Sequence, residues 1–138
     1  MADPISLASG LLALTTFALQ SSKSLYQAIE SFQKCPRTIC DLKEELEALD
    51  GVLHSLHETA SNSNIDLTGL KLPLLRCGNC CRDLETLINK CTTHSSGSKT
   101  SIRDWAKLQY MEKDIVGIQM MLAVYKSTIS IALADANV

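Results

Sequence analysis

The chain has 138 residues, of which 46% are hydrophobic and 20% charged, and its net charge at pH 7 is −2. A chain of this length is expected to form one domain, residues 1–138, and to bury roughly 68% of its unfolded surface without a metal or a disulfide. The small negative charge argues against a nucleic-acid partner, because no basic face is available to neutralise phosphates. Any membrane contact would have to come from apolar burial, since anionic lipids would not attract this chain.

The first predicted helix covers residues 4–33 and is apolar on more than one face. Asp3 can cap this helix, and Pro4 suits its first position. One apolar stripe contains Leu11, Leu14, Ala18, Leu25, Ala28 and Phe32, and another contains Ile5, Leu12, Leu19 and Tyr26. A helix with two apolar faces either lies centrally in a bundle or meets a membrane or another protein.

This helix therefore supplies the candidate membrane- or partner-binding residues of the chain. They are Ile5, Leu11, Leu12, Leu14, Phe17 and Leu19. We expect Leu12 and Leu19 to be covered in the resting protein, by the rest of the bundle or by a second copy. The helix is the least polar of the four predicted, and we expect it to be the most enclosed.

The same segment carries no recognisable targeting signal. A secretory signal needs a positive start, and the first basic residue here is Lys23. The apolar run Ile5–Leu19 is shorter than the roughly 20 residues that span a bilayer. We expect a cytoplasmic protein that associates with membranes only on activation, in which the six cysteines are thiols. A disulfide between Cys35 and Cys40 would require an oxidising compartment.

The second predicted helix, residues 37–60, combines a regular apolar stripe with acidic residues. Thr38 and Asp41 form a candidate capping box. The apolar residues step by three and four and are Ile39, Leu42, Leu46, Leu49, Leu53 and Leu56. The acidic run Asp41–Asp50 is either a docking surface or a solvated face, and we favour the solvated face.

The third predicted helix, residues 67–93, carries cysteines on its apolar stripe. Pro73 lies inside this stripe, so either a short turn precedes a helix that starts near Pro73 or the helix kinks there. The stripe consists of Leu67, Leu70, Leu74, Cys77, Cys81, Leu84, Ile88 and Cys91. Cysteine on an apolar stripe behaves as a small hydrophobic residue. We therefore expect Cys77, Cys81 and Cys91 to be buried core thiols.

Two patterns resemble parts of a metal site. Cys77-x-x-Cys80 followed by Cys91-x-x-His94 has a zinc-like spacing. In a continuous helix, however, Cys80 and Cys91 would lie about 16 Å apart, too far for one tetrahedral zinc. His54 and His57 form half a metal site at most, with no second half in view. We predict no metal and no cofactor.

The fourth predicted helix, residues 101–134, begins at a candidate capping box, Ser101 with Asp104. Its stripe contains Trp105, Leu108, Met111, Ile115, Ile118, Leu122, Tyr125, Ile129 and Ala132. Met111, Met120 and Met121 suit an adaptable binding surface, but Met111 lies on the stripe, where core packing explains it better. No strand alternation competes with these patterns. The sequence therefore predicts an all-α, antiparallel four-helix bundle with a long C-terminal helix and an apolar N-terminal helix.

No catalytic constellation is present in the sequence. Phosphate-binding loops and nucleophile motifs are missing, so we expect no enzyme activity and no small-molecule substrate.

Three stretches carry a family resemblance that covers nearly the whole chain: MADPISLASGLLAL, LPLLRCGNCCRDLETLI and DIVGIQMMLAVYKSTISIAL. They resemble the fungal N-terminal domain of STAND proteins, which is related to HeLo and HeLo-like domains and precedes NACHT-type nucleotide switches. The resemblance implies an all-helical signalling module without catalytic residues, in which cysteines near Cys77 and Cys81 belong to the third helix. It also implies that this chain is the N-terminal part of a longer protein.

Three functional hypotheses follow. In the first, the domain acts by oligomerisation in programmed cell death or incompatibility, and its released first helix enters a membrane. In the second, the bundle stays folded and docks a like domain or a partner helix, with the acidic second helix as one candidate surface. In the third, the chain is a structural or ligand-binding bundle of fungal secondary metabolism, because related N-terminal domains can occur in proteins encoded near such pathways.

Overall fold

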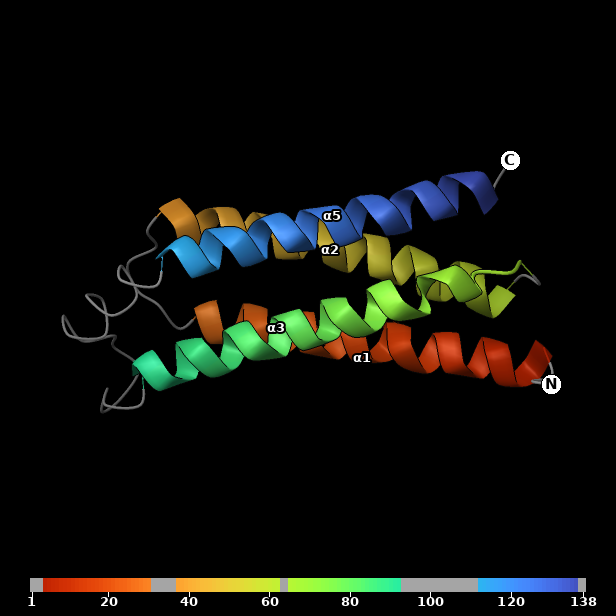
Figure 1. The fold of residues 1–138 in the computed structure, drawn as a ribbon, viewed down its shortest axis with the longest axis horizontal. Coiled ribbons are helices and arrows are strands. Elements are labelled where there is room, and N and C mark those ends of the chain that lie inside the picture. Colours follow the sequence, from red (N-terminus) through yellow and green to blue (C-terminus); the bar gives the residue numbers. More distant parts are fainter. Residues whose placement is uncertain (1–3, 31–36, 63–64, 93–111, 137–138) are drawn as a thin grey trace.

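The computed structural model describes residues 4–30, 37–62, 65–92 and 112–136, with side chains from Gly10 in the first range and up to Lys90 in the third. The described residues form helices without any strand: α1 (Pro4–Glu30), α2 (Arg37–Asn62), α3 (Lys71–Thr92) and α5 (Glu112–Ala136). A single 3₁₀ turn, η1 (Thr68–Leu70), precedes α3. The predicted all-α bundle with a long C-terminal helix is confirmed (Figure 1).

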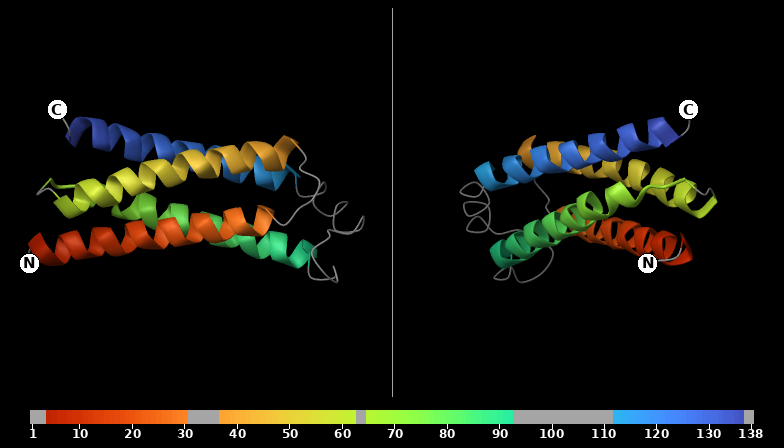
Figure 2. Two further views of the ribbon diagram at one scale, coloured as in Figure 1. Left: turned by 180° about the vertical axis from the view of Figure 1, so that it is seen from behind. Right: turned by 45° about the vertical axis from the view of Figure 1, so that its right-hand side comes forward.

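Along the bundle, α1 and α3 run in one direction, and α2 and α5 run in the other (Figures 1 and 2). α1 packs against α2 and α3, and α5 packs against the same two helices, so α1 and α5 lie diagonally opposite each other. As a result, α1 and α3 are neighbours that run in parallel, and so are α2 and α5. The beginning of α1 and the end of α5 lie at the same end of the bundle.

The leucine stripe of α2 forms the centre of the core. All six stripe residues are buried: Ile39, Leu42, Leu46, Leu49, Leu53 and Leu56. Burying one such side chain contributes roughly 1.5–3 kcal/mol. The three-and-four spacing keeps these side chains on one side of α2, which faces the other helices.

The start of α3 resolves the two alternatives for Pro73. η1 ends at Leu70 and α3 begins at Lys71, so Pro73 lies in the first turn of the helix. The first four N–H groups of a helix have no acceptor within it, and proline therefore removes no hydrogen bond at this position. A short turn followed by a helix is the correct alternative, and the predicted helix over residues 67–93 begins four residues too early.

α1 and α3 approach each other closely at Gly78. This glycine is buried, and the ring of Phe17 on α1 occupies the space where a larger residue would place its Cβ. An added Cβ would lie 2.6 Å from Phe17 Cδ2, well inside van der Waals contact. The guanidinium of Arg82 lies over the same ring, 5.0 Å from its centre. Phe17 is thereby held between a glycine and a cation on α3.

Acidic side chains of α2 connect this helix to its neighbours. Lys126 on α5 forms an ion pair with Glu45, with 2.9 Å between Nζ and Oε1. The hydroxyl of Tyr26 on α1 donates to Glu47 at 2.7 Å, and this bond raises the pKa of Tyr26 to about 12. The acidic run is therefore more than the solvated face that we expected, because two of its carboxylates link α2 to α1 and α5.

Two further expectations for α2 are corrected. Thr38 lies inside α2, which begins at Arg37, so it is not the residue before the helix that a capping box needs. Its hydroxyl donates instead to Glu112 on α5 at 2.8 Å. Cys40 is disulfide-bonded, so the expectation of six thiols is wrong at this position.

Candidate interaction surface

α5 is apolar both toward the core and toward solvent. Its inner face carries Ile115, Leu122, Ile129 and Leu133, all of which are buried against the bundle. Between Asp114 and Asp135 the only charged residue is Lys126, whose side chain pairs with Glu45 on α2. The outer side of α5 is therefore left without charge over most of its length.

The outer face of α5 holds most of the large exposed apolar side chains in the described residues. Met120, Val124 and Ile131 are 65%, 62% and 63% exposed, and Val116 and Met121 accompany them. These five residues are called the outer face below. Three other large apolar residues are exposed, Ile65, Leu72 and Leu75, and they lie before or within α3. An exposed apolar patch of this kind is typical of a binding surface.

A groove borders the C-terminal half of this face. It has a volume of about 500 Å³ and lies between residues 65–70 and α5. Ile65, Thr128, Ile131 and Asp135 are among its lining residues. The groove is thus continuous with the outer face and offers a recess beside Ile131.

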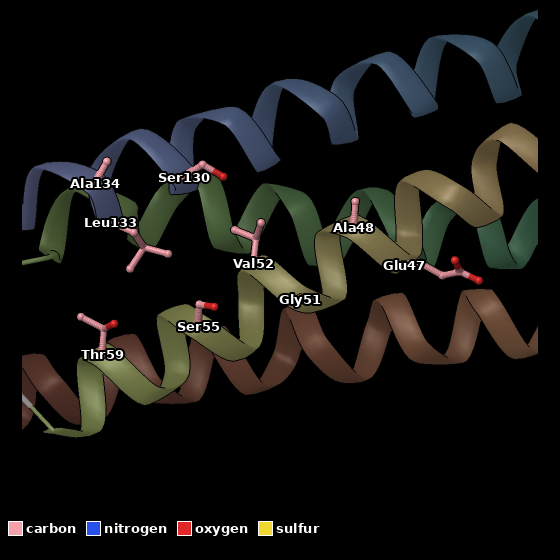
Figure 3. Close-up of a pocket in the computed structure, with 9 residues that line it drawn as sticks. All are labelled: Glu47, Ala48, Gly51, Val52, Ser55, Thr59, Ser130, Leu133 and Ala134. Atoms are coloured by element: carbon pink, nitrogen blue, oxygen red, sulfur yellow. The ribbon is translucent and has the colours of Figure 1, made fainter. Parts of the chain in front are cut away.

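A second groove runs between α2 and α5 (Figure 3). Its volume is about 540 Å³, and it is open because small residues such as Gly51 and Ala134 line it. The polar groups in it are the hydroxyls of Ser55, Thr59 and Ser130 and the carboxylate of Glu47 at one end. Small-molecule sites usually enclose most of their ligand and converge several polar groups on it. This groove lacks both properties, so the outer face is the stronger candidate.

The candidate residues of α1 are covered by the bundle. Leu11 is buried, with 4% of its surface exposed, and Leu12 and Leu19 are half-buried. Leu14 and Phe17 are half-buried too, whereas the side chain of Ile5 lies outside the described residues. The coverage of Leu12 and Leu19 agrees with expectation, because α1 meets α2 on one side and α3 on another. Whether this helix binds a membrane or a partner stays a prediction.

Two of the three predicted core thiols of α3, Cys77 and Cys81, are packed in the core as the stripe indicates. Cys77 and Cys81 are fully buried free thiols, and Cys80 is 9% exposed. Burial raises the pKa of Cys80 to about 11, and a hydrogen bond with Cys77 together with burial raises the pKa of Cys81 further. Such thiols are poor nucleophiles at neutral pH. The side chain of Cys91 lies outside the described residues.

The described residues contain no group of three or more metal-ligating side chains that could hold an ion. His54 is exposed and lies 3.5 Å from Asp50 on the same helix, and His57 is half-buried. His94 lies outside the described residues, as do Ser101, Asp104, Trp105, Leu108 and Met111.

Sequence reasoning placed the two-faced apolar helix at α1, assigned Met111 to the core and raised an adaptable binding surface for the methionines. Met120 and Met121 are exposed on the outer face, as an adaptable binding surface would require, and Met111 lies outside the described residues. Their positions gave a usable signal: Val116, Met120 and Val124 are four residues apart, and the stripe that contains Ile115 and Leu122 lies on the opposite side. A helix with two apolar stripes cannot bury both against two neighbours on one side.

α5 is also the one helix among the described residues that is long and apolar enough to cross a membrane by length and composition alone. Its 25 residues extend about 37 Å, compared with roughly 30 Å for the hydrocarbon core of a bilayer. A core helix of a soluble bundle can pass the same test, so this observation is weak evidence for membrane contact.

A family described as "Pigment biosynthesis cluster protein PigL N-terminal" matches residues 2–138. The chain belongs to this PigL N-terminal family. No curated protein and no solved structure matches this PigL N-terminal domain. The match confirms the expectation of a known family of N-terminal domains, and the family's description names a setting close to that of the third hypothesis. It carries no information on STAND or HeLo proteins, and those resemblances stay predictions.

Proposed function

We propose that this PigL N-terminal domain is a non-enzymatic signalling module that acts by oligomerisation through the outer face of α5. The observation that carries the proposal is the concentration of exposed apolar residues: five of the eight large ones in the described residues lie on α5. Soluble monomers rarely expose large contiguous apolar patches unless those patches bind something. Association would remove this surface from water and leave the core unchanged.

The signalling role rests on the resemblance to N-terminal domains of STAND proteins. In that setting the bundle is joined to a nucleotide-switch segment, which brings several copies together, and the assembled bundles produce the output in cell death or incompatibility. The alternative is an adaptor bundle that binds another protein without any membrane activity. Both roles use a folded bundle with an apolar docking face.

Contact with a membrane is the second candidate function, and the length and composition of α5 favour it. Placing α5 across a bilayer would withdraw Ile115, Leu122 and Ile129 from the core. Losing a buried side chain of this kind costs about 2–5 kcal/mol. Release of α1 would similarly withdraw Leu11 and Leu25. Docking of a protein on the outer face has no such cost, and we therefore favour protein association over insertion.

The test is the size of the chain in solution, measured by sedimentation velocity from about 5 to 300 µM. Val124→Glu places a charge at the centre of the outer face, whereas Ala13→Glu places one on the exposed side of α1, diagonally across the bundle. We expect the unaltered chain and Ala13→Glu to associate and Val124→Glu to remain monomeric. A monomer at every concentration rejects the proposal. If that monomer sediments with lipid vesicles and Val124→Glu does not, membrane contact is the function instead.

A further inference from the structure

Seven exposed positions of α5 form a stripe whose spacing is identical when it is read in either direction. The stripe consists of Lys113, Gly117, Met120, Val124, Thr128, Ile131 and Asp135. Successive members are 4, 3, 4, 4, 3 and 4 residues apart, so the stripe is symmetric about Val124. At about 100° per residue, all seven lie within an arc of about 80° on the side opposite Leu122. This set is called the symmetric stripe below.

The residues of the symmetric stripe are complementary about its centre. Lys113 and Asp135 are eleven residues before and after Val124 and carry opposite charges. Gly117 and Ile131 are each seven residues from Val124. Gly117 has no side chain, whereas Ile131 has a large branched one. No atom lies within 4 Å of the position that a Cβ would take on Gly117, so the space above it is open.

We propose that the partner of the outer face is a second copy of this chain, packed antiparallel through α5 with a two-fold axis at Val124. This inference rests on the proposed function and names its partner. In such a pair, residues at equal distances from Val124 lie at the same height on the two helices. Lys113 of each copy then meets Asp135 of the other, and Ile131 of each copy fills the space above Gly117 of the other. Val124 packs against its own counterpart on the axis.

The groove beside α5 supports the same register. Met120 lies four residues before Val124 and therefore faces Thr128 of the second copy, at the edge of the 500 Å³ groove. Methionine is the side chain that adapts best to an irregular recess. Met120 is also the most exposed of the large apolar residues, so it is free to enter that groove.

A parallel pair of α5 helices lacks these properties. Parallel packing at the same register would place Lys113 against Lys113 and Asp135 against Asp135, and like charges at such distances repel. It would also place Gly117 against Gly117, which leaves a void between the helices. Antiparallel packing instead places Lys113 against Asp135 and Gly117 against Ile131, and both contacts are favourable. We therefore infer that the two α5 helices pack antiparallel.

The pair is expected to be weak when the chain is free in solution. One helix from each copy forms an interface at the small end of the range for specific complexes, which is typical of weak or transient pairing, and we expect a Kd of about micromolar. An equilibrium of this strength suits a module that is monomeric when dilute and pairs when it is concentrated locally.

Charge reversal tests the register. Lys113→Asp and Asp135→Lys each replace two attractive contacts of the pair with two repulsive ones, so each should weaken the dimer by about tenfold at low salt. The double variant Lys113→Asp with Asp135→Lys should restore it. Within one chain the two residues are separated by most of α5, so the rescue can only come from contact between copies. Kd is measured by sedimentation, and thermal melting confirms that each variant is folded.

A substitution at Gly117 tests the packing independently. The Cβ of Gly117→Leu meets no neighbouring side chain within 4 Å in its own copy, and the larger side chain fills the space that Ile131 of the second copy needs, so the variant should fold and lose pairing by at least tenfold. Gly51→Leu, at an equally open glycine on α2, is the matched control and should pair like the unaltered chain.

The outcomes separate this inference from the proposed function. Association that Val124→Glu abolishes, but that both single charge reversals leave unchanged, overturns the antiparallel register and keeps the proposed function. Unchanged pairing of Gly117→Leu also overturns the register. A chain that is monomeric at all concentrations overturns both. Loss of pairing in the single variants and its return in the double variant is the expected result.

Discussion

The contact between Gly78 and Phe17 predicts that one substitution has opposite effects at two helical glycines. Gly78→Ala places a methyl group 2.6 Å from Phe17 Cδ2, whereas Gly51→Ala on α2 meets nothing within 4 Å. Replacing glycine by alanine inside a helix stabilises a protein by about 0.5–1 kcal/mol when space is available. Overpacking in a filled site costs about 1–3 kcal/mol. Gly51→Ala should therefore stabilise the chain and Gly78→Ala should destabilise it by up to about 2 kcal/mol.

The assay is thermal and urea unfolding followed by circular dichroism. For a chain of 138 residues, 1 kcal/mol corresponds to a Tm shift of roughly 3–4 °C, so the two variants should differ by about 4–11 °C. The clash is attributed to one ring, and Phe17→Ala removes it. In a Phe17→Ala background, Gly78→Ala should lose its cost and become neutral or stabilising. Equal Tm values for Gly78→Ala and Gly51→Ala would refute the reasoning.

Three further predictions follow from the core and from the perturbed groups. Leu53→Ala should destabilise the chain by about 2–5 kcal/mol in urea, because Leu53 is fully buried on α2, whereas Val124→Ala should change the stability of the monomer by less than about 0.5 kcal/mol. Tyr26 should ionise near pH 12 in an ultraviolet titration, and Glu47→Gln should move its pKa back toward 10, since the hydrogen bond with Glu47 is the main cause of the shift. The free energy of unfolding should fall as the pH rises from about 9 to 11, because the unfolded chain releases the Cys80 proton near pH 9 and the folded chain retains it to about pH 11. An equally steep fall in Cys80→Ala would contradict this assignment.

Much of the bundle could be predicted from periodicity. The six stripe residues of α2, from Ile39 to Leu56, are all buried. Charged residues lie between them, so only one side of this helix is apolar enough to face a core. The cysteine stripe of α3 follows the same rule at Cys77 and Cys81. In both helices the polar residues mark the outside, and the sequence alone is sufficient.

The candidate site could not be predicted in this way. α5 has apolar residues on its inner side, such as Leu122, and on its outer side, such as Val124, so periodicity does not say which side the bundle covers. The answer depends on how many neighbours the helix has, and among the described helices α5 packs mainly against α2 and α3. The order of helices around the bundle is set by long-range packing, which no single helix encodes. At α1 the expectation of cover was met, because its two apolar faces do meet two helices.

The position of the two ends of the bundle has a mechanical consequence. Because α1 begins and α5 ends at the same end of the bundle, a load applied between these two points pulls diagonal helices apart sideways at that end. In this unzipping geometry the contacts between helices break a few at a time along the bundle. In a shear geometry they would all break together. In a single-molecule stretching experiment, such a fold should yield at low force and without a sharp peak.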